Sequence, residues 1–143
     1  MTRFHFPLAK VRDFRQRQLE MEEAKLEALH AERQALAAES AHLERETELT
    51  RLSLMVTGVV EAQELVASDR YLRQLSAGKK RLAARLCDWK ARADKQQQAI
   101  VEARRRVRLL ENREERKLRE WQVGADREQE NLAAELYLAK WKR

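Results

Sequence analysis

Residues 72–110 read LRQLSAGKKRLAARLCDWKARADKQQQAIVEARRRVRLL, and this stretch decides the fold. Its apolar side chains recur at steps of three, four and seven residues, with polar Lys79 and Gln96 as interruptions. The recurring residues are Leu72, Leu75, Leu82, Leu86, Trp89, Ala93, Ile100, Ala103, Val107 and Leu110. This spacing puts one apolar stripe along a helix, and a stripe about five heptads long is typical of a coiled-coil seam.

The composition agrees with long helices. The chain has 143 residues, of which 38% are charged, three are glycine and one is proline. Globular proteins use about 7% glycine and about 5% proline. No segment alternates β-branched or aromatic residues with polar ones between turn residues, as strands do. We therefore expect an all-α chain that forms a single coiled-coil domain over residues 1–143 and encloses no catalytic pocket.

The first half carries a seam of its own, which is half polar. Its apolar members are Leu8, Val11, Leu19, Leu26, Leu29, Leu36 and Leu43. Arg33, Ser40 and Thr47 occupy the alternate seam positions. The frame then slips by one residue and continues through Leu49, Leu52, Val56, Val59, Gln63 and Val66. Such a slip is expected to change the local supercoil winding without ending the helix.

The break signals between the two seams predict a reversal of the chain. Gly58 weakens a helix by about 1 kcal/mol relative to alanine, and Ser68 followed by Asp69 resembles a helix N-terminus. We therefore expect a long two-helix antiparallel coiled-coil hairpin, with arm one at about 8–57, a reversal zone at about 58–69 and arm two at about 69–140. The longer second arm is expected to overhang at its C-terminal end. Gly78 is a rival turn, ranked second because the seam continues through it in frame.

The charge of the two halves favours pairing between them. Residues 1–68 have a net charge of −3 and residues 69–143 a net charge of +9. Opposite signs favour one antiparallel partner over association of like arms. A turn near residue 67 places Glu27 and Glu32 opposite the basic run Arg104–Arg108, whereas a turn near Gly78 would place Glu44, Glu46 and Glu48 there.

No pattern of catalytic or metal-ligating residues stands out. The three histidines are scattered, the one cysteine is Cys87, and the chain has no phosphate-binding glycine loop. We expect a protein that is not an enzyme and has no catalytic residues, no metal and no cofactor. The longest apolar patch, Leu52–Val60, is half of the roughly 20 residues that a membrane span needs, and no signal-peptide core is visible at the N-terminus. The sequence therefore predicts a cytoplasmic location.

Tryptophans and an apolar cluster suggest contacts with other proteins. Trp89 is expected in the core, whereas Trp121 and Trp141 are expected to contact a partner, because they lie toward the overhang. The cluster Leu52, Leu54, Met55, Val56, Val59 and Val60 is apolar on more than one helix face, so an exposed tip would be a docking surface. The basic run could bind nucleic acid, but it is interleaved with glutamates and has no aromatic stacking platform, so we expect no nucleic-acid partner.

Three segments resemble the FliJ family, the small coiled-coil stalk proteins of the flagellar type III export apparatus. The first is the opening Phe4-His5-Phe6-Pro7-Leu8-Ala9-Lys10-Val11, followed by Arg15. The second is Tyr71-Leu72-x-x-Leu75, shortly after a mid-chain break that contains glycine. The third combines Arg104–Arg108, Leu110-Glu111 and the block Arg127-Glu128-Gln129-Glu130-Asn131-Leu132. The chain departs from the family at Ala133-Ala134, where an Asp-Glu pair is usual, and near Trp121, where a tyrosine is usual.

The resemblance implies a role as a non-enzymatic stalk and adaptor that helps couple ATP hydrolysis to protein export. It implies three partners: the hexameric export ATPase, the cytoplasmic domain of the membrane export gate, and export chaperones. The chain would then be peripheral to the inner membrane through these partners only. The residues at the ATPase end would be Phe4, Phe6, Leu8, Val11, Trp121, Glu128, Gln129 and Leu132. The residues at the gate-facing tip would be Met55, Val56, Val59, Val60, Tyr71, Leu72 and Leu75.

Two alternatives remain open at the level of sequence. One is the injectisome type III secretion stalk, which belongs to the same family. The other is a generic basic coiled coil that acts as a scaffold or nucleic-acid binder.

Overall fold

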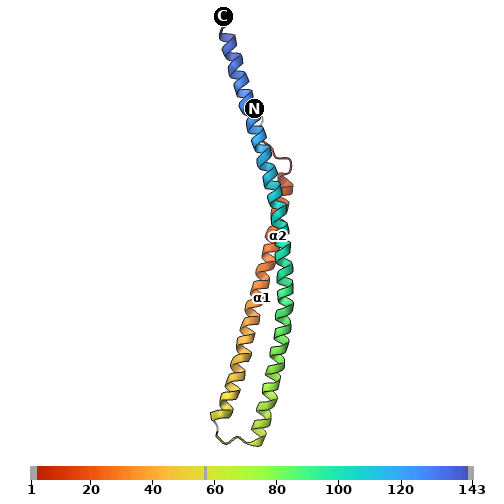
Figure 1. Cartoon of the computed structure of the whole chain (residues 1–143), viewed down its shortest axis with the longest axis vertical. Coiled ribbons are helices and arrows are strands. Elements are labelled where there is room, and N and C mark those ends of the chain that lie inside the picture. The colour runs from red at the N-terminus through yellow and green to blue at the C-terminus, as the bar shows by residue number, and fades with distance from the viewer. Residues whose placement is uncertain (1–2, 57, 142–143) are drawn as a thin grey trace. The chain divides into compact units, whose positions relative to one another are not determined.

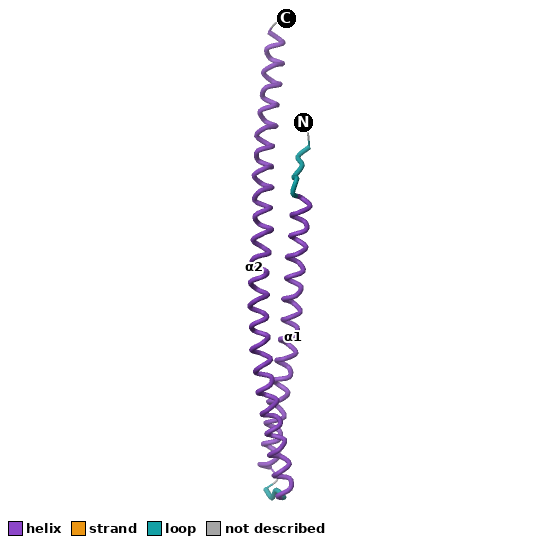
Figure 2. The backbone as a smooth tube through the Cα atoms, turned by 90° about the vertical axis from the view of Figure 1, so that its right-hand side faces the viewer, coloured by secondary structure: helices purple, strands orange, loops and turns teal. Residues whose placement is uncertain are grey.

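The computed structural model describes residues 3–56 and 58–141, and most of these residues form two long helices. Helix α1 spans Ala9–Val56 with 48 residues, and helix α2 spans Ala62–Trp141 with 80 residues. The two helices run antiparallel and pack against each other, joined by a short loop (Figures 1 and 2). No strand occurs among the described residues. The prediction of an all-α, two-helix antiparallel hairpin is confirmed.

The loop lies within the predicted reversal zone but is shorter than that zone. Gly58 has a φ of 49°, a left-handed conformation that glycine adopts without strain. Helix α2 begins at Ala62, and the Leu65 amide donates to the Glu61 carbonyl oxygen at 3.1 Å. The predicted helix start at Ser68–Asp69 is therefore wrong. One N-cap residue stabilises a helix by only about 1 kcal/mol. Residues 62–68 are good enough helix formers to continue α2 on the N-terminal side of Ser68. The predicted end of arm one at Thr57 lies outside the described residues.

Gly78 is an interior residue of α2, so the rival turn is wrong. A Cβ atom added at Gly78 would lie 3.6 Å from a Leu43 methyl carbon, an ordinary packing distance. The glycine therefore sits on the face of α2 that meets α1.

The tertiary contacts divide the chain into two compact units, which we describe separately. Residues Glu22–Ala99 form what we call the loop unit. Residues Met1–Met21 and Ile100–Arg143 form what we call the terminal unit.

The core of the loop unit follows the predicted seam of α2. Leu36 of α1 is 1% exposed, and it packs with Leu82, Trp89 and Ala93 of α2. Leu29, Leu43 and Leu86 border this cluster. Each apolar position predicted for residues 72–99 is buried or half-buried, as are the interruptions Lys79 and Gln96. The heptad prediction for this part of α2 is confirmed.

The predicted frame slip in α1 is wrong. The buried stripe keeps the earlier, more polar frame through Leu43, Thr47, Thr50 and Leu54, and Thr47 is 9% exposed. The hydroxyl groups of Thr47 and Thr50 donate to the carbonyl oxygens of Leu43 at 2.7 Å and Glu46 at 2.8 Å. Because these hydroxyls are satisfied within the helix, their burial costs little. The apolar residues of the slipped frame, Leu49, Leu52, Val56, Val59 and Val66, lie exposed.

The terminal unit has a thinner core. Its buried apolar side chains are Phe6, Leu19, Ile100, Val107 and Ala125. All residues from Asp126 to Trp141 are exposed. No helix among the described residues is long and apolar enough to cross a membrane.

Candidate interaction surfaces

Ion pairs between the helices of the loop unit fix a register that differs from the predicted one. Arg92 places its guanidinium fork on the carboxylate of Glu32, with Nη1–Oε2 and Nη2–Oε1 distances of 3.0 and 2.7 Å. Arg85 contacts Glu39 at 2.8 Å. The expected pairing of Glu32 with the run Arg104–Arg108 is therefore wrong, because it assumed a turn several residues too late. The hydrogen bond from Arg92 holds the pKa of Glu32 below its ordinary value.

Two polar contacts add to this register on either side of the core. The Gln96 amide donates to the carbonyl oxygen of Glu22 at 2.8 Å and also to its carboxylate. The hydrogen bond from Lys25 is the main cause that lowers the pKa of Glu22, and the hydrogen bond from Gln96 is the second. The Tyr71 hydroxyl donates to Glu46 at 2.9 Å, and this hydrogen bond to a carboxylate raises the pKa of the phenol. Glu46, which a turn near Gly78 would have paired with the basic run, thus has a different partner.

Trp89 is a core residue, as predicted. Its exposed fraction is 9%, and its indole N–H donates to the Leu29 carbonyl oxygen at 2.6 Å. The Arg33 guanidinium lies over the ring, 4.9 Å from its centroid. A large side chain is thereby accommodated in a two-helix seam.

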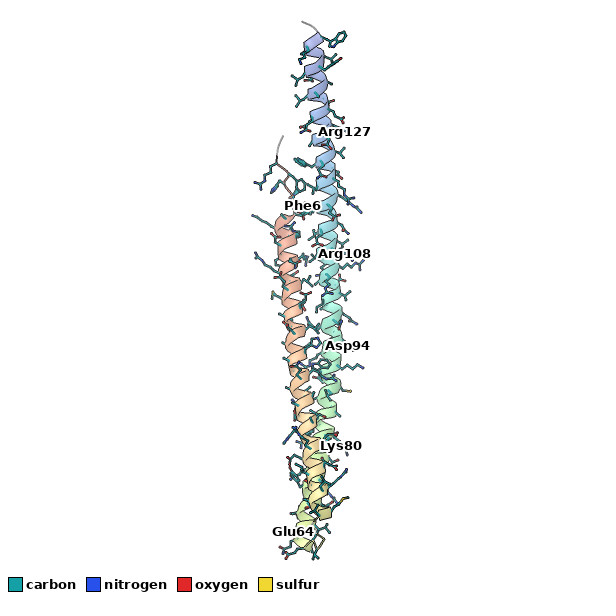
Figure 3. All side chains as sticks on the ribbon, turned by 90° about the vertical axis from the view of Figure 1, so that its left-hand side faces the viewer. Phe6, Glu64, Lys80, Asp94, Arg108 and Arg127 are labelled. Carbon is teal, nitrogen blue, oxygen red and sulfur yellow. The ribbon has the colours of Figure 1, made fainter. Side chains whose placement is uncertain are left out.

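The residues predicted for an ATPase end fall into two groups in the terminal unit. The first group is held within the chain: Phe6 is 5% exposed, Phe4 and Leu8 are half-buried, and the Phe4 ring lies 6.0 Å from the Trp121 ring (Figure 3 labels Phe6). Arg12 forms an ion pair with Glu114 beside them. Trp121, expected to contact a partner, is therefore engaged by Phe4 of the same chain.

The second group lies open to solvent. Glu128 and Gln129 are exposed, and so are Val11 at 43% and Leu132 at 59%. Four further apolar residues follow Leu132 on the exposed end of α2, namely Leu136, Tyr137, Leu138 and Trp141. The first three were not singled out from sequence. The pair Tyr137 and Trp141, one helical turn apart with ring centroids 6.4 Å apart, was the available signal.

The residues predicted for the tip also divide by exposure. Met55, Val56 and Val59 are 78%, 82% and 89% exposed. Val60 and Leu72 are half-buried, Leu75 is buried, and Tyr71 is held by Glu46. The accessible part of the tip is thus the end of α1 and the loop, and the Tyr71–Leu75 segment mainly holds the two helices together.

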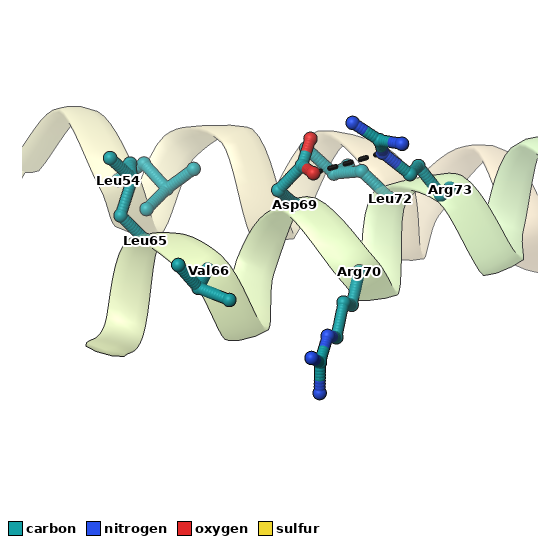
Figure 4. Close-up of a pocket in the computed structure, with 7 residues that line it drawn as sticks. All are labelled: Leu54, Leu65, Val66, Asp69, Arg70, Leu72 and Arg73. Atoms are coloured by element: carbon teal, nitrogen blue, oxygen red, sulfur yellow. Dashed lines mark ion pairs between the residues drawn. The ribbon is translucent and has the colours of Figure 1, made fainter. Parts of the chain in front are cut away.

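A groove of about 600 Å³ opens beside this tip (Figure 4). Leu54 of α1 and three apolar residues of α2, Leu65, Val66 and Leu72, line it. Asp69, Arg70 and Arg73 also line the groove, and Asp69 and Arg73 are joined by an ion pair of 2.9 Å. A groove lined by both apolar and charged side chains suits contact with a protein segment.

Among residues 3–56 and 58–141, no group of three or more histidine, cysteine, aspartate or glutamate side chains is placed to hold a metal ion. The candidate interaction surfaces are the exposed apolar side chains at the loop and toward the end of α2. Comparison of the chain with family models, with curated proteins and with solved structures finds no match.

Proposed function

We propose that this protein is a non-enzymatic stalk and adaptor of a flagellar type III export apparatus. In this role the terminal unit binds the export ATPase ring, and the tip binds the cytoplasmic domain of the export gate. The hairpin fold and the sequence resemblance to the FliJ family support this proposal. Chaperone binding and coupling of ATP hydrolysis to export belong to the same proposal.

The observation that carries it is the position of the exposed large apolar side chains. Among the described residues, seven lie between Leu49 and Val66 and five lie between Leu132 and Trp141. Exposed apolar patches of this kind mark protein contacts. Because one patch lies at the loop and the other at the end of α2, the chain offers two separate docking surfaces.

Reciprocal surface variants test the proposal. The first variant carries Leu132→Gln and Leu136→Gln, and the second carries Met55→Gln and Val59→Gln. All four side chains are at least 59% exposed, so neither variant is expected to disturb the core. Each binding experiment uses the other variant as its matched control.

The first variant should lose at least about tenfold in affinity for the export ATPase, because two apolar anchors are removed, and it should keep its affinity for the gate domain. The second variant should show the opposite pattern. If the unmodified chain binds neither protein, the proposal is wrong. Tighter binding to an injectisome ATPase than to a flagellar one would assign the chain to the injectisome system.

A further inference from the structure

A line of arginines follows the outer side of α2 in the terminal unit. It consists of Arg105, Arg108, Arg116 and Arg119, which we call the arginine stripe. At about 100° per residue the four side chains fall within an arc of about 80°, and they span about 21 Å along the axis. All four are exposed (Figure 3 labels Arg108).

The stripe lies away from the face that packs. Val107 is 5% exposed, and Leu110 and Leu118 are half-buried, so these residues mark the packed face. The stripe is centred well over 90° from them around the helix.

Exposed apolar side chains share the outer side with the arginines. Val101 and Leu109 are each 62% exposed, and Val123 is 50% exposed. The outer side of α2 therefore carries a line of positive charge, with an exposed apolar side chain at each end and one in the middle.

Little within the chain neutralises this stripe. Arg119 approaches Glu115 at 3.5 Å, but the two side chains are 75% and 67% exposed, so the pair is screened by water. For Arg105, Arg108 and Arg116 the described part of the chain contains no hydrogen bond or ion pair. Glu32, the acidic residue expected opposite this region, binds Arg92 instead. The stripe keeps its charge available for another molecule.

We propose that the arginine stripe binds an acidic amphipathic helix of a partner protein, which lies along α2 between Val101 and Val123. The positive charge of the stripe is complementary to acidic side chains on the partner helix. The exposed side chains of Val101, Leu109 and Val123 require that the same partner helix also carry an apolar ridge. A nucleic acid fits less well, because it offers no apolar ridge and the outer side of this segment has no exposed aromatic ring for base stacking. The stripe belongs to the terminal unit but uses none of the exposed apolar residues between Leu132 and Trp141, so the inference does not rest on the proposed function.

Three fluorescent probes test this inference. The first is a synthetic 24-residue peptide with leucine at every a and d heptad position and glutamate on both flanks. The second replaces each glutamate with lysine, and the third is a 24-base-pair DNA duplex. The matched protein variants change the same charge: Arg105, Arg108, Arg116 and Arg119 to glutamine in one, and Lys80, Arg81, Lys90 and Lys95 to glutamine in the other.

The acidic peptide should bind the unmodified chain saturably and gain helicity on binding. Binding should weaken about tenfold in the stripe variant and change less than about twofold in the control variant. The inference is overturned if the acidic peptide does not bind, if the lysine peptide binds as well, or if both variants lose affinity equally. Tighter binding of the DNA, with a steep loss on adding salt, would assign the stripe to nucleic acid instead.

Discussion

The indole N–H of Trp89 on α2 donates to the backbone carbonyl oxygen of Leu29 on α1 over 2.6 Å. This contact ties the largest side chain of the seam to the backbone of the opposite helix, beside the cluster built on Leu36 and Leu82. It is specific to tryptophan, because phenylalanine could fill part of the space but has no donor. The contact therefore fixes both packing and register.

Replacing Trp89 with phenylalanine should lower the free energy of unfolding by about 1–2 kcal/mol, through the lost hydrogen bond and the smaller ring. Trp89→Ala should cost about 3 kcal/mol or more. Urea denaturation followed by circular dichroism measures both values. The matched control is Trp141→Phe, at a ring that is 78% exposed, where the change should stay within about 0.5 kcal/mol. Equal effects at the two positions would contradict the core assignment.

Stability should fall with acidification through the carboxylates of Glu32 and Glu22. Both pKa values lie below the ordinary value of 4.5 in the folded chain, Glu32 mainly through Arg92 and Glu22 mainly through Lys25. A carboxylate with a depressed folded pKa stabilises the fold above its unfolded pKa, and this contribution is lost as the pH falls through the folded pKa. The urea concentration at the unfolding midpoint should therefore decrease as the pH is lowered below about 4.5.

The variant Arg92→Gln removes the main cause of the lowered Glu32 pKa, so it should flatten the loss of stability that sets in as the pH falls below about 4.5. High salt should have a similar effect on the unmodified chain, because the cationic partners Lys25 and Arg92 are exposed. An unchanged pH profile in Arg92→Gln would exclude the Arg92–Glu32 pair as a source of the pH dependence.

Two glycines should respond in opposite ways to alanine. Gly78 lies inside α2, and an added Cβ would touch Leu43 at an ordinary 3.6 Å, so Gly78→Ala should stabilise the chain by about 1 kcal/mol. Gly58 has a φ of 49° with open space around it, so Gly58→Ala should destabilise it by about 1 kcal/mol through the backbone alone. Thermal unfolding measures both changes. Stabilisation by Gly58→Ala would show that the loop glycine is not left-handed.

The seam of α2 could be predicted from sequence, because a sustained three-four rhythm of large apolar residues allows only one buried stripe. Leu75, Leu82 and Trp89 are all buried where the spacing placed them. The same rule failed in α1, where a polar stripe through Thr47 competes with an apolar one through Leu49 and Leu52. Hydropathy alone favoured the second stripe. The structure buries the first, since the threonine hydroxyls bond to their own helix.

The register and the candidate surfaces depended on details that the spacing does not contain. Ser68 is a plausible helix start, yet α2 begins at Ala62, and this change moves the partner of Glu32 from the basic run to Arg92. Met55, Val56 and Val59 are exposed at the tip, whereas Leu75, which the family resemblance put in the same tip group, is buried as its seam position predicts. Exposure depends on which residues of the other helix lie opposite, and that follows only from the register.

Disulfide formation between engineered cysteines tests the antiparallel pairing most directly. Ser40 and Lys79 are both half-buried, and the register set by the Trp89–Leu29 and Gln96–Glu22 hydrogen bonds places them opposite each other. The register expected from a turn near residue 67 would place Ser40 opposite Lys95 instead. Two proteins are compared under mild oxidation with Cys87 replaced by serine: one carries Ser40→Cys and Lys79→Cys, and the other carries Ser40→Cys and Lys95→Cys. A disulfide needs Cα atoms within about 7 Å, so the first protein should form an intramolecular bond, seen by mass and gel mobility, and the second should not. An intramolecular bond only in the second protein, or only disulfide-linked dimers of the first, would contradict the hairpin described here.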